Sequence, residues 1–458
     1  MRSLRKALKV IKRRRRWAML TGDSLKVLRR LPEASVDAIV TDPPAGIQLY
    51  GCEWDADKGG AEKWIHWLTR IMRECLRVLK PGGHIVSWSI PVTSHWTATA
   101  IERAGFEIRD GIVHISPTGM PKGLDAARAI RKLHQLPKAE RQQLASNWLE
   151  WNTTLKPVAE IWILGRKPLD GTVAENLVKH GVGAINLNAA RPGRGRWPTN
   201  FMASHHPDCT KQRCVAECPV LAVRQDGKLL GRDEASTSST KTGKYQHPMD
   251  KIKHQRVGKR IDADLARDGI AVGTAPPLDA LFTVAKHQKA HTLHPTRAHE
   301  YRSRGIATTE PKASKAPVAT KDGALFFYAG KSNVTDRHLG CEDLRWRFLR
   351  NGDIQRISST RYNRLYQRNL RGGKYVPLGV GNVHPTAKNT RLSFKLVKLI
   401  TPPGGLVLDA FCGSGSIGRA ALAADCRFIG IELSKGYSLI ARRRIASFAR
   451  THQPLFAK

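Results

Sequence analysis

The sequence predicts an α/β fold of the doubly wound kind, in which helices cover both faces of a parallel sheet. Short apolar runs alternate with amphipathic segments of helical period between residues 17 and 168, and the alternation returns between residues 404 and 433. Buried parallel strands are short and continuously apolar, and the helices between them make the crossovers. A chain of 458 residues accommodates one large elaborated domain or about two to three smaller ones.

The first half of the chain supplies most of the predicted units. Strands are predicted for the apolar runs WAMLT, VDAIVT, HIVSWSI and FEIRDGIVHIS, and for a run within residues 152–168. Between them, SLKVLRRL, AEKWIHWLTRIMRECLRVLK and TSHWTATAIERAG carry apolar residues at helical spacing. Pro81, Gly82 and Gly83 are expected to end the second of these helices.

The second half begins irregularly and ends in order. Residues 226–322 are rich in Ser, Thr, Lys, Gly and Pro and have no periodicity, which predicts a loop-rich insertion. Regularity returns at ALFFYAGKS, and GGLVLDAFCGSGSIGRAALAADCRFIGIEL predicts strand, glycine-rich turn, helix and strand. The chain is therefore divided into a basic arm (1–16), a first core half (17–204), an inserted region (205–322) and a second core half (323–458).

The charge of the chain is its most unusual global property. Lys and Arg number 77 against 38 Asp and Glu, a formal net charge of +39. Such an excess favours a nucleic acid as partner through attraction and counterion release. Arg13, Arg14, Arg15 and Arg16 stand in a row, and the arm that carries them is expected to be a solvated tail with nonspecific contacts, with a helix bound to DNA as the alternative.

Membrane and secreted classes are not expected. No window approaches about 18 uninterrupted apolar residues, and no amphipathic anchor accompanies the positive charge. The basic N-terminus lacks the apolar stretch of a signal peptide, and the eight cysteines are too few for a disulfide scaffold in so long a chain. A cytoplasmic protein, bacterial or phage-encoded, is expected; its oligomeric state, including a homodimer, stays open.

The glycine-rich turn near the end gives the strongest sign of a ligand site. The strand LVL ends at Asp409, the turn contains Gly413 and Gly415, and the next strand ends at Glu432. Glycines let the backbone approach a ligand at the carboxyl edge of the sheet, where α/β folds bind nucleotides. Glu432 is positioned to take two ribose hydroxyls.

A second sign is Asp42-Pro43-Pro44, directly after the strand AIVT. The prolines fix the backbone, so that a carboxylate and backbone carbonyls are held at the sheet edge. This arrangement can accept hydrogen bonds from an exocyclic amino group. A strand that simply stops at a proline turn gives the same tripeptide.

Together, VDAIVTDPPAG and HPTAKNTRLSFKLVKLITPPGGLVLDAFCGSGSIGRAALAADCRFIGIEL resemble the S-adenosylmethionine-dependent DNA amino-methyltransferases, which modify adenine N6 or cytosine N4. The order of the motifs is similar to that of the beta class, and the resemblance covers residues 17–204 and 323–445. It implies a seven-stranded, doubly wound methyltransferase sheet (Rossmann-like), mostly parallel with one antiparallel strand, and an inserted target-recognition region.

The resemblance also implies roles for individual residues. Asp42, Pro43 and Pro44 are the expected catalytic motif. The residues expected to bind S-adenosylmethionine are Asp23, His384, Thr386, Lys388, Asp409, Phe411, Gly413, Gly415 and Glu432. Hydrogen bonds from the target amine to Asp42 and to the Pro43 carbonyl would aim its lone pair at the methyl group, and the base must leave the duplex to reach them.

The resemblance further implies adenine N6 in DNA as the substrate, because Asp rather than Ser precedes the prolines. Cytosine N4, methylation of RNA, and a DNA-binding homologue without catalysis are the alternatives. The last is suggested by Ala45, where the family usually has an aromatic residue that stacks on the flipped base. Tyr50 and Trp54 are candidate substitutes, or else they only pack the loop.

Two further groups are candidate binding residues. Arg345, Arg347 and Arg350 lie in a stretch that interleaves arginine with aromatic residues, which suits DNA binding or an ordinary surface helix. In this class the target-recognition region lies between the catalytic half and the HPTxK segment, which is residues 384–388 of this chain. The cluster His205, His206, Cys209, Cys214 and Cys218 suits a structural zinc site, with three unlinked thiols as the alternative.

Overall fold

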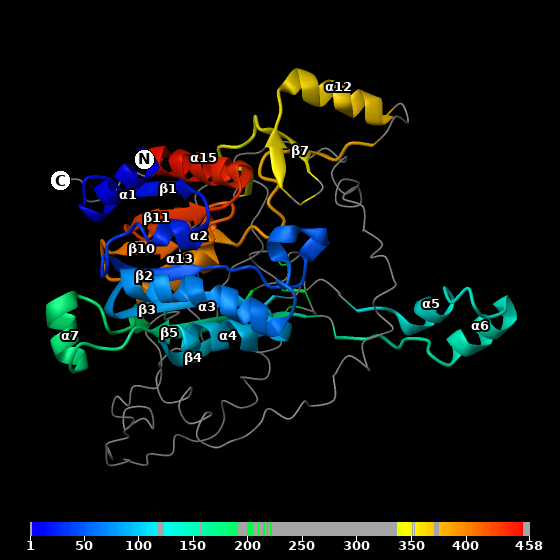
Figure 1. Cartoon of the computed structure of the whole chain (residues 1–458), viewed down its shortest axis with the longest axis horizontal. Helices are drawn as coiled ribbons and strands as arrows, with labels where there is room; N and C mark the ends of the chain where they lie inside the picture. Colours follow the sequence, from blue (N-terminus) through cyan, green and yellow to red (C-terminus); the bar gives the residue numbers. More distant parts are fainter. Residues whose placement is uncertain are drawn as a thin grey trace, which may run out of the picture. The chain divides into compact units, whose positions relative to one another are not determined.

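The computed structural model describes residues 2–116, 123–155, 157–190 and 199–204, scattered positions between 209 and 221, and residues 337–451 except 350, 352 and 371–374. The strands of its main sheet are β1 (Trp17–Thr21), β2 (Val36–Thr41), β3 (Leu79–Ser89), β4 (Glu107–Ile115), β5 (Ala159–Arg166), β6 (Phe201–Ala203), β10 (Leu406–Asp409) and β11 (Arg427–Glu432). They form an eight-stranded sheet in the order β1-β11-β10-β2-β3-β5-β4-β6 (Figure 1).

The direction of the strands confirms the doubly wound class. Every neighbouring pair is parallel except those of β5, which is antiparallel to both β3 and β4. Seven strands were expected, and the described residues form eight. The additional strand is the short β6 (Phe201–Ala203), which pairs with β4. The single antiparallel strand is as expected.

The two halves of the chain share this sheet. β10 and β11, from the end of the chain, lie between β1 and β2, from its start. Val407 pairs with Ala38 and Leu408 with Ile39 in the register of β10 and β2. Because the carboxyl ends of parallel strands meet at one edge, Asp42 and Asp409 are brought to neighbouring positions.

Helices cover both faces. One face is covered by α13 (Thr390–Ile400), α14 (Ser416–Ala423) and α15 (Lys435–Thr451); the other by α1 (Arg2–Ile11), α2 (Ser24–Leu28), α3 (Ala61–Val78) and α4 (Ser94–Arg103). Successive strand residues point to opposite faces. Met19 packs with the first group of helices, and Ala18 and Leu20 pack with the second.

Two expectations about the first half are wrong. The basic arm is a helix, α1, rather than a tail: Ala7 and Val10 are fully buried, one helical turn apart, and Arg427 donates hydrogen bonds to the carbonyls of Val10 and Ile11 at 2.8 and 3.2 Å. The helix α3 ends at Val78, so Pro81, Gly82 and Gly83 lie inside the strand β3 rather than ending the helix. In α1, apolar residues at helical spacing pack against the core, and this packing stabilises the helix despite its positive charge.

The arginine-rich stretch forms a separate small unit. β7 (Arg345–Phe348) pairs antiparallel with β8 (Ile354–Arg356) and with β9 (Leu378–Val380). The buried Trp346 packs with Tyr437 and Ile440 of α15. The helix α12 (Ser359–Leu370) follows β8, projects from the molecule in Figure 1 and buries none of its residues. This stretch is therefore a sheet and an exposed helix.

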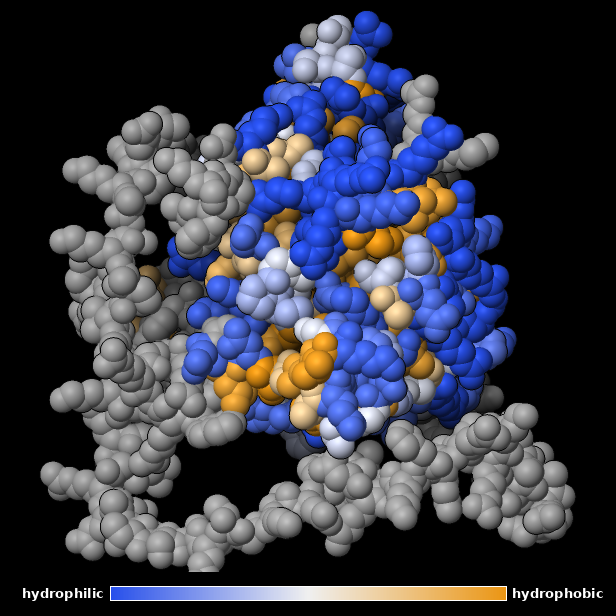
Figure 2. Space-filling view, turned by 90° about the vertical axis from the view of Figure 1, so that its left-hand side faces the viewer, coloured by the Kyte–Doolittle hydropathy of each residue, from blue (hydrophilic) through white to orange (hydrophobic). Residues whose placement is uncertain are grey.

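The remaining described helices are α5 (Ala126–Ile130), α6 (Lys138–Ser146), α7 (Val173–His180) and α8 (Leu187–Ala190). The segment ALFFYAGKS, where regularity was expected to return, and most of the inserted region lie outside the described residues. Within the described part, none of the helices has the length and apolar character needed to cross a membrane. The face shown in Figure 2 is largely hydrophilic, with separate hydrophobic patches.

Candidate active site

A cavity of about 950 Å³ opens at the carboxyl edge of the main sheet. Its lining includes Asp42, Pro43 and Pro44, which follow β2, and every residue expected to bind the cofactor except Gly415. The two sequence motifs thus border one space. A direct hydrogen bond joins their strands, from Thr41 Oγ1 to Asp409 Oδ1 at 2.8 Å.

The glycines of the turn serve packing as well as approach. Gly415 begins α14 with φ +80, and a Cβ there would lie 3.0 Å from the Cα of Ala441 in α15. Gly413 has φ +50, and a Cβ there would lie 2.8 Å from Nε2 of His384. The turn and the HPTxK segment are therefore in close contact at Gly413.

Asp409 carries an unused acceptor. Its Oδ1 accepts from Thr41 and from the Phe411 backbone N–H at 3.1 Å, whereas its buried Oδ2 has no hydrogen-bond partner among the described residues. Burial raises the pKa of Asp409 to about 8. A buried acceptor without a partner is costly, so a cationic or N–H-bearing ligand group beside Oδ2 would be stabilising.

Glu432, at the end of β11, holds the turn in place. Its Oε2 accepts from the Gly413 N–H and its Oε1 from the Ser434 N–H, both at 2.8 Å. Each carboxylate oxygen has a second lone pair, so both can still accept from ligand hydroxyls. Burial raises its pKa to about 7. Asp23 also lines the cavity, while its carboxylate caps α2 by accepting from the Lys26 N–H at 2.9 Å.

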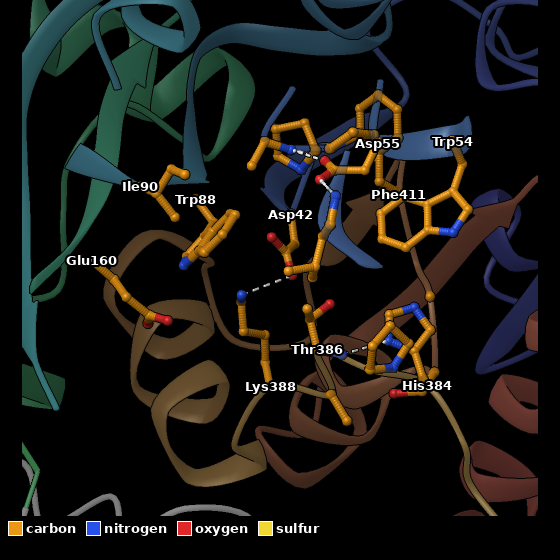
Figure 3. Close-up of a pocket in the computed structure, with 18 of the residues that line it drawn as sticks. Asp42, Trp54, Asp55, Trp88, Ile90, Glu160, His384, Thr386, Lys388 and Phe411 are labelled. Atoms are coloured by element: carbon orange, nitrogen blue, oxygen red, sulfur yellow. Dashed lines mark hydrogen bonds and ion pairs between the residues drawn. The ribbon is translucent and has the colours of Figure 1, made fainter. Parts of the chain in front are cut away.

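His384 forms an aromatic wall on the cofactor-loop side. Its ring meets Tyr437 edge-on, with centroids 4.5 Å apart, and lies 6.3 Å from the Trp54 ring. Its Nδ1 accepts from the Thr386 N–H at 3.3 Å, and burial lowers its pKa to about 3, so the ring is neutral. Trp54 lies near Phe411 on this side of Asp42, opposite Trp88 and Glu160 (Figure 3).

The segment after the prolines is fixed by an acid that sequence reasoning missed. Asp55 is buried, and its carboxylate accepts from the N–H groups of Ala45 (2.5 Å), Gly46 (3.1 Å) and Leu49 (2.9 Å). Ala45 itself is buried, with its carbonyl accepting from Thr93 Oγ1 at 2.8 Å. The side chain of Tyr50, the other stacking candidate, lies outside the described residues.

Asp42 lies beside a lysine. Lys388 Nζ is 3.2 Å from Asp42 Oδ2, so this lysine of the HPTxK segment contacts the catalytic motif. Burial raises the pKa of Asp42 to about 6, although Lys388 lowers it. The carboxyl is thus ionised at neutral pH and close to the range in which it takes up a proton.

Three further polar residues behind Lys388 were not found from the sequence. Glu160 at the start of β5 contacts His114 Nδ1 of β4 at 3.1 Å, and His114 Nε2 contacts Ser204 Oγ at 2.8 Å. All three line the cavity. The signal that could have found Glu160 is an acid inside the apolar run AEIWILG.

The candidate DNA-binding arginines have different environments. Arg345 is occupied within the protein: its Nη1 donates to the carbonyls of Glu342 (2.9 Å) and Leu344 (3.2 Å), and its guanidinium lies over Tyr362. Arg347 is half-buried on β7, and Arg350 lies outside the described residues. The neighbouring helix α12 exposes Arg361, Arg364 and Arg368.

The three cysteines of the candidate zinc cluster come together. The Sγ atoms of Cys209, Cys214 and Cys218 lie within 4.8 Å of one another, and none is in a disulfide. Their surroundings are apolar, with Ala203 of β6 and Val220 buried beside them. His205 and His206 lie outside the described residues.

Known DNA methyltransferases are similar in sequence to this chain. The model of the family described as DNA methylase, of the N6 and N4 type, matches residues 36–443. Type II methyltransferase M.HindIII of Haemophilus influenzae is 24% identical over 234 residues, 43% of this chain and 72% of that protein. Type II methyltransferase M.BamHI of Bacillus amyloliquefaciens is 31% identical over 85 residues, 19% of this chain and only 20% of that protein.

Among solved structures similar to this chain is the cytosine-N4-specific PvuII DNA methyltransferase. The two superpose with a TM-score of 0.41 at 12% sequence identity, over 94% of this chain and 86% of that one. The family match, by contrast, takes in both motifs that border the cavity, from Asp42 to Glu432.

Proposed function

Since the chain belongs to the N6/N4 DNA methylase family, we propose that it transfers a methyl group from S-adenosylmethionine to an exocyclic amino group of a base in DNA. The observation that supports this proposal is that Asp42-Pro43-Pro44 and the glycine turn line the same cavity. They lie together because the strands that precede them, β2 and β10, are neighbours in the sheet. The net charge of +39 suits a polyanionic substrate.

The cavity suits S-adenosylmethionine, which would supply an electrophilic methyl group on a sulfonium centre. Asp409, whose Oδ2 has no hydrogen-bond partner among the residues that the structure describes, would accept from or lie beside a cationic part of the cofactor. Glu432 would accept from the ribose hydroxyls, and Asp23 would lie toward the adenine amine. His384, Thr386, Phe411 and Gly413 would form the surrounding wall.

Asp42 would orient the nucleophile. An exocyclic amine is a weak nucleophile because its lone pair is delocalised into the ring. Hydrogen bonds from its two N–H groups to the Asp42 carboxylate and the Pro43 carbonyl would increase the lone-pair character of the nitrogen and fix its direction. The nitrogen must lose a proton when it gains the methyl group, and a carboxyl with a pKa of about 6 can accept that proton.

We propose adenine N6 as the target, because an Asp precedes the two prolines. The test is incubation of the purified protein with DNA and methyl-labelled S-adenosylmethionine, followed by digestion to nucleosides. Label in N6-methyldeoxyadenosine supports the proposal. Label in N4-methyldeoxycytidine would replace the base, label only in RNA would replace the substrate, and cofactor binding without transfer would mark a DNA-binding homologue without catalysis.

The DNA would be held by the inserted region together with the arginine-rich unit. Arg347 and Arg350 remain proposed DNA contacts, in addition to the exposed arginines of α12. The hydrogen bonds of Arg345 to backbone carbonyls give it a supporting position within the protein instead. Exposed guanidinium groups on one helix suit the spaced phosphates of a nucleic acid backbone. Trp54 remains a proposed aromatic partner on the cofactor side of Asp42.

We also propose that Cys209, Cys214 and Cys218 bind a structural zinc ion, with His206 as fourth ligand. The mutual proximity of the three sulfur atoms supports this. Burial and the two neighbouring thiols raise the pKa of Cys214 to about 11, and a metal would reverse this by binding the thiolates. Metal analysis should find about one zinc per chain, lost on Cys214→Ser and kept on Cys426→Ser. If the parent protein contains no metal, the zinc proposal is wrong and the three cysteines are thiols that pack together.

A further inference from the structure

Lys388 lies in an environment that a cofactor-binding role does not explain. Its side chain is only 11% exposed, and its Nζ lies 3.4 Å from the centroid of the Trp88 ring as well as 3.2 Å from Asp42 Oδ2. Lysine is almost never buried without a charge partner or an aromatic face. Figure 3 shows the ammonium group between Asp42 and the side of the cavity formed by Trp88 and Glu160.

Glu160 provides a second negative charge for this lysine. Burial disfavours its charged form, yet Lys388 and His114 outweigh burial and lower its pKa to about 2. Glu160 is thus ionised at every pH at which the protein would act. His114 Nδ1 contacts the Glu160 carboxylate at 3.1 Å, and Ser204 Oγ contacts the other ring nitrogen of His114 at 2.8 Å. The ammonium group therefore lies in the field of two carboxylates on different elements.

The charges around Asp42 oppose one another. Burial raises its pKa most, Lys388 lowers it, and the acids Glu160 and Asp55 raise it further. Asp409, on the adjacent strand β10, is the remaining nearby carboxyl. Among the groups that act most strongly on Asp42 in the described part of the chain, Lys388 is the cation.

We propose that Lys388 is a positioning residue for methyl transfer: held by Trp88 and Glu160, it keeps Asp42 ionised and directed at the target amine. This inference rests on the proposed function of the cavity. A protonated carboxyl would donate a hydrogen bond where the amine requires an acceptor, so the ion pair decides at which pH Asp42 can act.

Two substitutions then shift the pH dependence in opposite directions. Activity that needs ionised Asp42 is present above its pKa and is lost as the pH falls through it. Lys388→Met removes the cation, so Asp42 takes up a proton at higher pH. The acid limb of the pH–activity profile, the range in which activity falls as the pH is lowered, then moves to higher pH. Glu160→Gln removes an anion that raises the pKa of Asp42, so the acid limb moves downward. A purely structural role for either residue would not produce opposite shifts.

The experiment measures single-turnover methyl transfer at saturating DNA and S-adenosylmethionine between about pH 5 and pH 9. The parent should lose activity below a pH of about 6. We expect the acid limb of Lys388→Met to lie higher by about one pH unit or more, that of Lys388→Arg to stay near the parent's, and that of Glu160→Gln to lie lower. Lys398→Met, an exposed lysine on α13, is the matched control and should match the parent.

An unshifted acid limb in folded Lys388→Met would overturn the inference. If thermal unfolding shows that this variant does not fold, Glu160→Gln decides, and an unshifted or raised limb there would overturn it. An inactive parent would contradict the proposed function instead. In that case carbon NMR of carboxyl-labelled aspartate gives the pKa of Asp42 without turnover, and the same opposite shifts are required.

Discussion

Three carboxyls at the sheet edge define the chemistry of the cavity at the scale of single residues. Asp42, Asp409 and Glu432 end or follow three adjacent parallel strands, and burial raises their pKa values to about 6, 8 and 7. Asp409 and Glu432 are therefore substantially protonated at neutral pH when no ligand is bound. A cation that enters beside them stabilises their charged forms, so its binding must release protons.

This predicts pH-dependent cofactor binding. The affinity for S-adenosylmethionine should rise as the pH increases from about 6 to about 8, because ionised carboxylates bind a cation and protonated ones do not. Calorimetry in two buffers of different ionisation enthalpy measures the protons released, and Asp409→Asn should reduce their number. S-adenosylhomocysteine, which lacks the sulfonium charge, is the matched ligand. Equal proton release for both ligands and both proteins would contradict the assignment of Asp409.

A second residue-scale prediction concerns Gly413. Alanine there must adopt φ +50 and displace His384, whereas alanine at Gly404 must adopt φ +66 with nothing within 4 Å of its Cβ. Both changes should cost about 1 to 2 kcal/mol of unfolding free energy. Only Gly413→Ala should also weaken cofactor binding, which calorimetry measures. Equal cofactor affinity in the two variants would remove His384 and the turn from the binding site.

At the scale of elements, local patterns were predicted well and charged segments poorly. The unit β10, α14 and β11 could be read directly, because its strand ends, glycines and helix are contiguous in sequence. The helix α1 could not be predicted in this way, because the high positive charge of the segment favours a solvated tail. Its apolar face is made of only four residues, Leu4, Ala7, Val10 and Ile11. The arginine-rich stretch likewise divides into a small sheet with buried Trp346 and the exposed helix α12.

The exposure of α12 predicts a phosphate-binding helix. Replacing Arg361, Arg364 and Arg368 by glutamine should make the slope of log affinity against log salt less steep by up to about 3, without changing cofactor affinity. Replacing Arg29 and Arg30, exposed after α2, is the control and should leave the slope unchanged. DNA-binding titrations at several salt concentrations measure both. If the α12 variant keeps the parent's slope, DNA recognition must be sought in the inserted region.

At the scale of the whole molecule, the site depends on a strand order that sequence periodicity does not contain. Thr41 and Asp409 are 368 residues apart and are joined by a hydrogen bond because β10 enters the sheet beside β2. The two motifs could be found in the sequence itself, and the family resemblance drawn from them implied that they belong to one site. It did not supply the contacts between Lys388 and Asp42, between Glu160 and His114, or between Asp55 and the Ala45 segment. These pairs depend on how loops from distant strands pack, and no local pattern encodes that.

We propose that Asp42 directs methyl transfer in the cavity at the sheet edge. The most direct test of this role is single-turnover transfer of labelled methyl groups to DNA by Asp42→Asn, with cofactor and DNA affinities measured on the same preparation. Both affinities should stay within a few-fold of the parent's, while the rate of transfer should fall by about 100-fold or more, since a neutral amide is a weaker hydrogen-bond acceptor than a carboxylate and cannot take up the proton that the nitrogen loses. A rate near that of the parent would show that the reaction takes place elsewhere.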